Sequence, residues 1–245
     1  MAVSLAQLMY VARSGLVSQL MDLDVVSNNI ANINTVGFKN YRSNFQEMVN
    51  GNLRTGTQIR ATQINMTQGA VQLTTNPLNM CIQGLGFFSV KLPGGQTAYT
   101  RDGQFSEDAQ GNIVNANGYP LIWQGTIPTG SEEVSVQPTG EVMSRTGNVW
   151  TQVGTIQLSN FPNPSALTTI GQNLFQATAI SGAAQSAAPG TTGLGTLLGS
   201  SVEASNVNLS QEMTNMISLE RAFQVSSSFF KQSDTMMDEA IHIRR

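Results

Sequence analysis

The chain has 245 residues, enough for one large domain or two small ones with a real hydrophobic core. Its formal net charge is −3 and it has no basic stripe, so nucleic-acid binding has little electrostatic support. Only 11% of the residues are charged, against about 25% in a typical soluble domain. A surface so poor in charge suits subunits that pack against copies of themselves.

Three further features of the composition limit where the protein works. Cys81 is the single cysteine, so an intrachain disulfide is excluded. No apolar run approaches the roughly 20 residues that a membrane-spanning helix needs, so we expect no membrane insertion. The segment Met1–Ala6 lacks the basic leader and cleavage site of a signal peptide. We therefore expect any export to proceed without a cleavable signal peptide.

The first part of the chain, residues 1–32, has a helical pattern. Ser4 followed by Gln7 can form a capping box at the start of a helix. Apolar residues then recur every seven positions, which predicts an amphipathic helix that packs along a partner helix or on a globular core. These residues are Ala2, Met9, Leu16, Leu23 and Ile30.

The middle of the chain, residues 60–205, has a β pattern. Turn signals such as Asp102-Gly103, Asn117-Gly118 and Gly147-Asn148 recur at short intervals, which is typical of antiparallel hairpins in a sandwich or barrel. The stretch Ser181–Ser201 is rich in Gly, Ala, Ser and Thr, and we expect a loop or an extended arm there. Strands are predicted within Gly86–Leu92, Thr97–Arg101, Ile113–Asn115, Val134–Val136 and Val153–Leu158.

The last part of the chain predicts a second, longer helix. Asn208 can cap it, with Gln211 three residues later, and an apolar residue again recurs every seven positions. A helix over residues 208–243 would be on the order of 50 Å long, so it needs a partner of similar length. The N-terminal helix is the obvious partner. The repeating residues are Leu209, Met216, Phe223, Phe230 and Met237.

The predicted fold class is therefore α+β. Residues 1–32 and 206–245 form long terminal helices paired as an antiparallel coiled coil, because the chain leaves along one helix and returns along the other. Residues 33–70 form a connecting segment, extended or a β-hairpin, and residues 71–205 form a β-rich outer domain that is mainly antiparallel. We expect an assembly seam, against the alternative of an internal core with no assembly role. Its residues are Leu16, Leu23, Ile30, Leu209, Met216, Phe223, Phe230 and Met237.

Enzymatic chemistry has weak support in the sequence, and we expect no catalytic, cofactor-binding or metal-binding residues. His242 is the only histidine, and with one cysteine it gives neither a Ser-His-Asp or Cys-His site nor a zinc site. Asp102, Glu107 and Asp108 lie beside turns, and a paired-acid site there is the alternative to solvated turn carboxylates.

The segment Ser27–Lys39 ends the first helix in what we expect to be a packed turn, in which Gly37 permits a positive φ and Phe38 anchors the turn on apolar surface. The segment resembles the signature of the flagellar rod, hook and hook-associated axial proteins. Ile82–Phe88, Ala98–Phe105 and Gly118–Leu121 are similar to that family's β domain. Its terminal motifs correspond here to Asn28, Asn29, Ala31, Asn32, Asn34, Thr35, Gly37, Phe38, Ser205, Asn206, Val207 and Asn208.

The resemblance implies a structural subunit of the bacterial flagellar basal-body rod. Members of the family are exported unfolded by the flagellar type III apparatus and polymerise helically into a hollow drive shaft that crosses the periplasm and transmits torque. The partners it implies are further copies of the chain, other rod and hook proteins, and the export apparatus. The chain looks most like distal-rod members, with proximal-rod members next. A hook-type subunit or hook-associated paralogue is the alternative, although hook proteins usually carry an additional outer domain.

Overall fold

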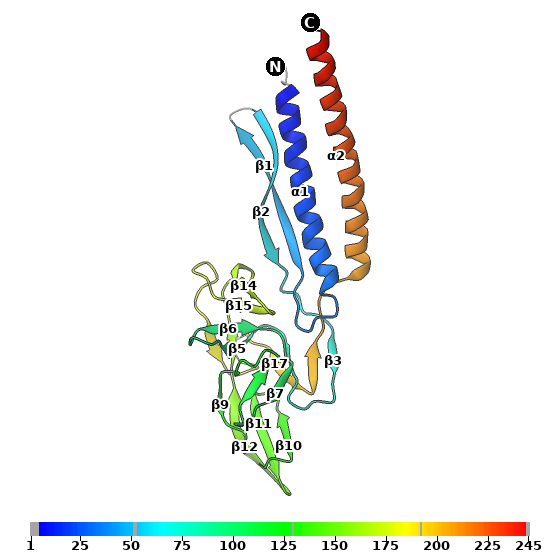
Figure 1. Ribbon diagram of the computed structural model, residues 1–245. Coiled ribbons are helices and arrows are strands. Elements are labelled where there is room, and N and C mark those ends of the chain that lie inside the picture. The colour runs from blue at the N-terminus through cyan, green and yellow to red at the C-terminus, as the bar shows by residue number, and fades with distance from the viewer. Residues whose placement is uncertain (1–4, 51–52, 129, 192, 244–245) are drawn as a thin grey trace. The chain divides into compact units, whose positions relative to one another are not determined.

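The computed structural model describes residues 5–50, 53–128, 130–191 and 193–243 (Figure 1). By its internal contacts the chain divides into two compact units. The helical unit comprises Met1–Asn32, Asn40–Asn65 and Val207–Arg245, and the β unit comprises Ile33–Lys39 and Met66–Asn206. Within the described residues, no helix has the length and apolar character needed to cross a membrane.

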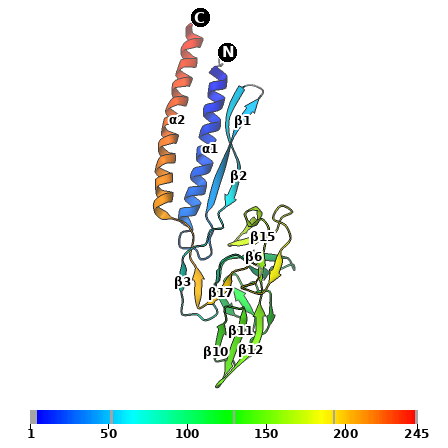
Figure 2. The same ribbon diagram turned by 180° about the vertical axis from the view of Figure 1, so that it is seen from behind.

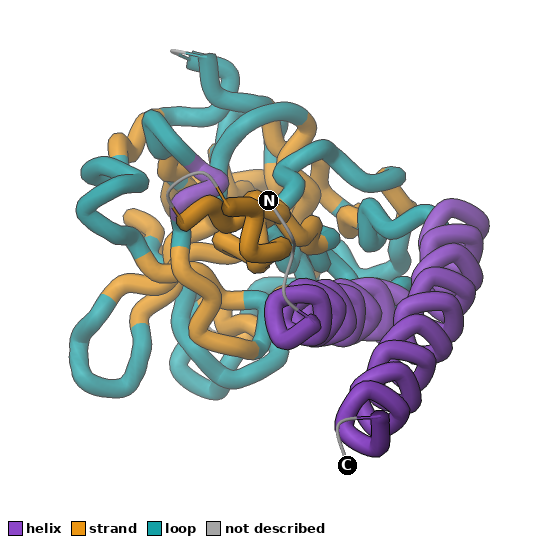
Figure 3. Tube along the Cα trace, turned by 90° about the horizontal axis from the view of Figure 1, so that it is seen from above, coloured by secondary structure: helices purple, strands orange, loops and turns teal. Residues whose placement is uncertain are grey.

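The helical unit contains the two predicted helices, α1 (Leu5–Ala31) and α2 (Leu209–Ile243), which lie side by side (Figures 1 and 3). Gln19 Nε2 on α1 donates to Ser226 Oγ at 3.3 Å, and Asn29 Nδ2 donates to Glu212 Oε1 at 3.4 Å. Partner numbers on α2 fall as numbers on α1 rise, so the helices are antiparallel. The α+β class with one helix at each end is confirmed. The predicted cap at Ser4 lies outside the described residues.

A long hairpin completes the helical unit. Its strands, β1 (Tyr41–Asn50) and β2 (Leu53–Ile64), pair antiparallel with two register shifts. The Ser18 hydroxyl of α1 donates to the Thr57 carbonyl of β2 at 3.1 Å. Consequently α1 lies between α2 and the hairpin (Figures 1 and 2), and it is the better-covered helix.

The β unit has antiparallel strand pairs throughout its described residues. Two four-stranded sheets, in the orders β14-β15-β6-β5 and β10-β11-β12-β9, accompany several two-stranded ones. In β11 the side chains alternate between buried and partly exposed, as expected for a strand with one face on a core. That core includes Met80, Phe88, Ile113, Val142 and Leu158.

The strands of the β unit have the following bounds: β3 Val71–Leu73, β4 Met80–Gln83, β5 Phe88–Lys91, β6 Thr97–Thr100, β7 Phe105–Glu107, β8 Ile113–Asn115, β9 Trp123–Gly125, β10 Glu133–Val136, β11 Glu141–Thr146, β12 Val149–Ile156, β13 Leu158–Asn160, β14 Thr168–Gly171, β15 Leu174–Gln176, β16 Gln185–Ala187, β17 Thr196–Gly199 and β18 Ser201–Glu203. A short 3₁₀ helix spans Pro164–Ala166. Each of the five predicted strand segments contains or overlaps a strand.

The prediction of a loop or arm over Ser181–Ser201 is wrong in part. β16 pairs with β13, and β17 pairs with β4. A Cβ added at Gly195 would lie 2.3 Å from the Gln83 carbonyl oxygen, so the small residue is what lets this chain segment approach β4. A composition typical of loops here serves close backbone packing.

Candidate functional site

The predicted motif around Gly37 lies at a junction inside the β unit, where residues 33–39 meet three later segments. Gly37 has φ +69°, and a Cβ added there would lie 2.5 Å from the Asp102 backbone nitrogen. The Gly37 N–H donates to the Glu203 carbonyl at 2.7 Å, and the Asn206 N–H donates to the Phe38 carbonyl at 3.4 Å. The two terminal motifs therefore meet directly, and glycine permits their approach.

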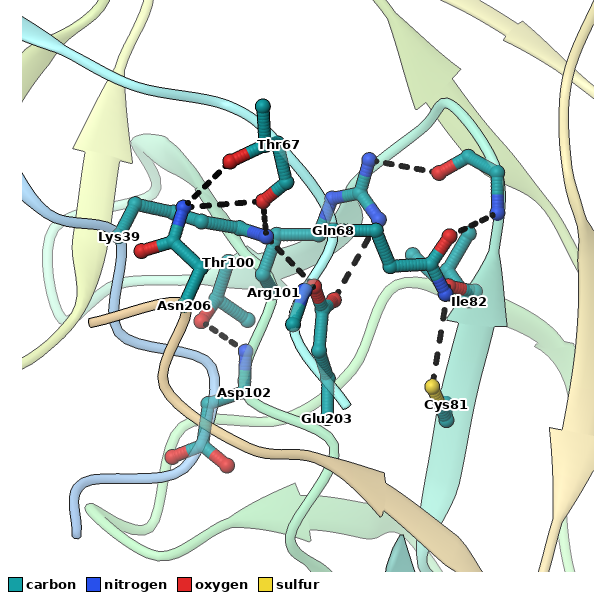
Figure 4. Close-up of polar contacts among 12 residues, drawn as sticks. Lys39, Thr67, Gln68, Cys81, Ile82, Thr100, Arg101, Asp102, Glu203 and Asn206 are labelled. Carbon is teal, nitrogen blue, oxygen red and sulfur yellow. Dashed lines mark hydrogen bonds and ion pairs between the residues drawn. The ribbon is translucent and has the colours of Figure 1, made fainter. Parts of the chain in front are cut away.

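Three charged side chains form the centre of this junction (Figure 4), and we call Lys39, Arg101 and Glu203 the junction cluster. Lys39 Nζ lies 2.5 Å from Glu203 Oε1, and Arg101 Nη1 lies 3.5 Å from Glu203 Oε2. The side chains are only 1%, 3% and 0% exposed, in the order named. One carboxylate therefore faces two cations in a site closed to solvent.

Backbone groups also bond to the cluster. Lys39 Nζ donates to the Thr67 carbonyl at 2.8 Å, and the Gly69 N–H donates to Glu203 Oε1 at 2.8 Å. Arg101 Nη2 donates to the Gly84 carbonyl at 2.9 Å, and its guanidinium lies 5.2 Å from the centre of the Phe87 ring. The cluster thus joins the two terminal motifs to the strands of the β unit.

Burial controls the electrostatics of the junction cluster. It lowers the pKa of Lys39 and that of Arg101, because a desolvated cation is disfavoured, and the Glu203 carboxylate opposes both shifts. Removing one partner of a buried ion pair costs about 3–5 kcal/mol, because the other charge stays buried without compensation. Glu203 is therefore the residue on which both cations depend.

Cys81 lies beside this cluster and provides a probe of the β unit. Burial raises the pKa of its thiol to about 11, and the Glu203 carboxylate acts in the same direction. We predict that an aromatic disulfide reagent at pH 8 leaves the folded protein unmodified and labels one thiol after denaturation, because the thiolate is the reactive form. Labelling is followed by absorbance. The control is Leu73→Cys in a Cys81→Ser background, since Leu73 is 83% exposed and should be labelled at once. Rapid labelling of native Cys81 would contradict the prediction.

In the helical unit, the motif residue Asn29 joins three elements. Its side chain donates to the Tyr41 carbonyl and accepts from the Tyr41 N–H, both at 2.9 Å, and it also donates to Glu212 of α2. At the start of α2, Asn208 Oδ1 accepts from the Gln211 N–H at 3.3 Å, so the predicted cap is confirmed.

Glu212 gives the helical unit a dependence on pH. Its pKa is raised, chiefly because burial disfavours the carboxylate, while the hydrogen bond from Asn29 acts in the opposite direction and the charge of Asp22 adds to the rise. The folded unit therefore holds this proton more firmly than the unfolded chain, whose ordinary pKa is 4.5. The stability that this proton contributes is fully present below the unfolded pKa and is lost as pH rises through the folded pKa.

We therefore predict that Glu212→Gln, which cannot ionise, makes the helical unit at least as stable as wild type at pH 7. The difference should vanish toward pH 4.5. Urea denaturation followed by helical circular dichroism at several pH values measures it. Glu220→Gln, at an exposed position of α2, is the control and should follow wild type. A variant less stable than wild type at every pH would show that the hydrogen bond outweighs the burial of the charge.

The structure places most of the predicted seam residues at half-buried positions along the two helices. Leu16, Leu23 and Ile30 on α1, and Met216, Phe223 and Phe230 on α2, are of this kind, and Leu209 is 44% exposed. The side chain of Met237 is not among the side chains that the structure describes. Among the helix side chains that the structure describes, the buried ones are instead Ser18, Val26, Asn29, Glu212 and Ser233.

The remaining motif residues range from buried to exposed. Phe38 and Val207 are buried, and the Phe38 N–H donates to the Thr35 carbonyl. Asn206 Nδ2 donates to the carbonyl and the hydroxyl of Thr67 at 3.0 and 3.1 Å. Asn28, Ala31 and Asn34 are exposed, whereas Asn32 and Ser205 are half-buried. Asn32 bonds back to Asn28 and ends α1.

The junction cluster was absent from the predicted site residues, although Lys39 lies in the segment Ser27–Lys39, Arg101 lies in Ala98–Phe105, and Glu203 comes two residues before the motif residue Ser205. One signal in the sequence could have found it. No charged residue or histidine occurs between Arg145 and Glu203, so Glu203 is an isolated charge at the end of a long uncharged segment. A single charge in such a setting is a candidate for burial with a partner.

Two of the three carboxylates of the alternative paired-acid site have roles in turns, and the third, Glu107, is the exposed last residue of β7. Asp102 Oδ1 accepts from the Gln104 N–H at 3.0 Å. Asp108 Oδ1 accepts from the N–H groups of Gln110 and Asn112 at 2.9 and 2.8 Å, and the bonds from Asn112 lower the pKa of Asp108. Both side chains thus stabilise the tight connections between strands.

Comparisons with known proteins place both motifs and the β unit in one group. The chain matches the families described as "Flagella basal body rod protein" over residues 9–39, "Flagellar hook protein FlgE/F/G D1 domain" over residues 81–144 and "Flagellar basal body rod FlgEFG protein C-terminal" over residues 199–243.

Individual relatives cover nearly the whole chain. The flagellar basal-body rod protein FlgG of Caulobacter vibrioides is 39% identical over 97% of this chain and 99% of its own length. FlgG of Bacillus subtilis is 35% identical over 97% and 98%, and FlgF of Mesorhizobium japonicum is 31% identical over 95% of each chain. The chain therefore belongs to the family of flagellar basal-body rod proteins, whose members are structural subunits of the rod and not enzymes.

Proposed function

We propose that copies of this chain polymerise helically into the rod, with α1 and α2 paired as an antiparallel coiled coil that packs against the helices of neighbouring copies. The observation that carries the proposal is the amount of apolar surface left on this helix pair. Because α1 lies between α2 and the hairpin, α2 has α1 on one side, and large apolar side chains elsewhere on it are exposed. These are Leu209, Met213, Ile217, Val225, Phe229 and Met236.

α1 adds apolar surface of its own, since Tyr10, Val17, Leu20 and Met21 are exposed. Large exposed apolar surfaces mark interaction sites in soluble proteins. Six of the eight predicted seam residues are half-buried within one copy, so a neighbouring helix can complete their burial. Each fully buried apolar side chain contributes about 1.5–3 kcal/mol, which is how the polymer would resist torsion.

Export and location follow from the same proposal. The chain would pass unfolded through the flagellar type III apparatus without a cleavable signal peptide, and would assemble in the periplasm with other rod and hook proteins. Its single cysteine suits this route, because a chain poor in thiols crosses an oxidising compartment without forming wrong disulfides. Its mechanical role is to transmit torque along the shaft.

The experiment that tests the proposed function is electron microscopy of basal bodies from a strain that lacks this gene. We expect a truncated rod without a hook, and the length of the remaining stub places the protein as proximal or distal. Complementation with the wild-type gene is the control. A complete rod and hook in the deletion strain would reject the rod role and favour a hook-associated paralogue.

A further inference from the structure

The order of segments in the β unit gives Glu203 a special position. It is the last residue of β18, and the other strands of the unit and both cations of the junction cluster precede it in the chain. β18 is fully buried at Ser201, Val202 and Glu203. The unit therefore cannot reach its folded state until this segment is in place.

Val202 is the only apolar side chain of β18, so apolar burial specifies the pairing of this strand at one position. β18 pairs with β3 over three residues each, with Glu203 opposite Val71 and Ser201 opposite Leu73. The side chains of β3 are all exposed, so burial on that strand does not select among registers. A slip of two residues would bring Ser201 or Ser205 to the place of Glu203 and leave two cations without a carboxylate.

Hydrogen bonding inside the cluster is incomplete. Charge neutralisation is therefore what selects the register in which β18 pairs with β3. Within the described part of the chain, no hydrogen bond satisfies Arg101 Nε, Arg101 Nη1 or Glu203 Oε2. The contact of Arg101 with Glu203 is thus coulombic, at 3.5 Å. Setting the register of a structural element is the best-attested use of buried charges in proteins.

We infer that the pairing of Glu203 with Lys39 and Arg101 completes the folding of the β unit, a step that we call closure. The cations Lys39 and Arg101 oppose their own burial until β18 pairs with β3 in the native register, and Glu203 then neutralises both. Closure is the last step in folding of the unit. The biological use of this order rests on the proposed function, since a chain that is exported unfolded gains from a β unit that cannot close early. The folding step itself does not depend on rod assembly.

The test is the folding kinetics of the purified full-length chain with Glu203→Gln. Trp123 and Trp150 are the only tryptophans and both lie in the β unit, so their fluorescence reports that unit alone. If Glu203 pairs after the transition state, unfolding should accelerate by about 100-fold or more while refolding stays within about threefold of wild type. Refolding slowed in proportion to the lost stability, with unfolding unchanged, would overturn the inference.

The matched control is Glu133→Gln, the same change in the same unit. Glu133 pairs with Arg145 at 3.0 Å, but the two side chains are 49% and 39% exposed. An exposed pair contributes little, so both rates should stay within about threefold of wild type. Equal effects of the two variants would reject a special role for the junction cluster.

A second variant keeps the inference testable if Glu203→Gln does not fold. Lys39→Met alone should accelerate unfolding, because it removes a partner of Glu203. Added to Glu203→Gln it should slow unfolding and restore part of the native population, because it removes a buried cation that lacks a carboxylate. Native population is read by protection of Cys81 from labelling. If Lys39→Met lowers stability equally in both backgrounds, the cations do not oppose closure. The inference can fail while the proposed function holds. If the folding rates contradict the inference but cells that carry Glu203→Gln still build normal rods, the proposed function stands.

Discussion

Replacing Gly37 with alanine is expected to unfold the β unit under conditions in which wild type is stable. Gly37 has φ +69°, where an alanine costs about 1–2 kcal/mol. The new Cβ would also lie 2.5 Å from the Asp102 nitrogen and 2.7 Å from the Arg101 carbonyl carbon. Both atoms belong to backbone beside the junction cluster, so relief of the overlap would displace Arg101, at a further cost of about 1–3 kcal/mol.

Gly147→Ala is the matched control for this change. Gly147 has φ +63°, close to that of Gly37, but no atom lies within 4 Å of its added Cβ. It should therefore show the conformational cost of about 1–2 kcal/mol alone. Urea denaturation followed by tryptophan fluorescence gives both free energies of unfolding. Equal losses in the two variants would show that the approach of Gly37 to Asp102 does not matter to stability.

Replacing Phe230 with alanine is expected to stop rod assembly while the single chain still folds. Phe230 is half-buried in one copy, so the chain alone loses only part of the about 3–5 kcal/mol that truncation of a fully buried phenylalanine costs. The remainder is lost only when a neighbouring copy covers the side chain. Basal bodies should then resemble those of the deletion strain, and the cells should not swim.

Gln224→Ala is the control, since Gln224 is an exposed polar residue on the same helix. It should leave assembly and swimming unchanged. Stability of the purified chain and electron microscopy of basal bodies are measured together. A large loss of stability in Phe230→Ala with normal rods would mean that the seam residues form an internal core and have no assembly role.

The sequence alone determined the elements that depend on local pattern. Heptad spacing predicted α1 and α2 because an amphipathic helix must bury one stripe, and Asn208 with Gln211 predicted the start of α2 because a cap uses neighbouring residues. The turn signal Gly147-Asn148 located the hairpin of β11 and β12, in which Thr146 pairs with Val149, because glycine adopts the positive φ that such a turn needs. The motifs indicated the family that the comparisons then showed.

The tertiary structure decided which residues meet across long separations. Lys39, Arg101 and Glu203 have no common spacing, and only the pairing of β18 with β3 and the approach at Gly37 bring them together. It also decided that the segment 181–201, rich in small residues, contains strands. Gly195 has no side chain, so the backbone of this segment can approach that of β4 closely. Local pattern reports which face of an element is apolar. It does not report what covers that face, because the partner lies far along the chain or, for the seam on α2, as we propose, in another copy.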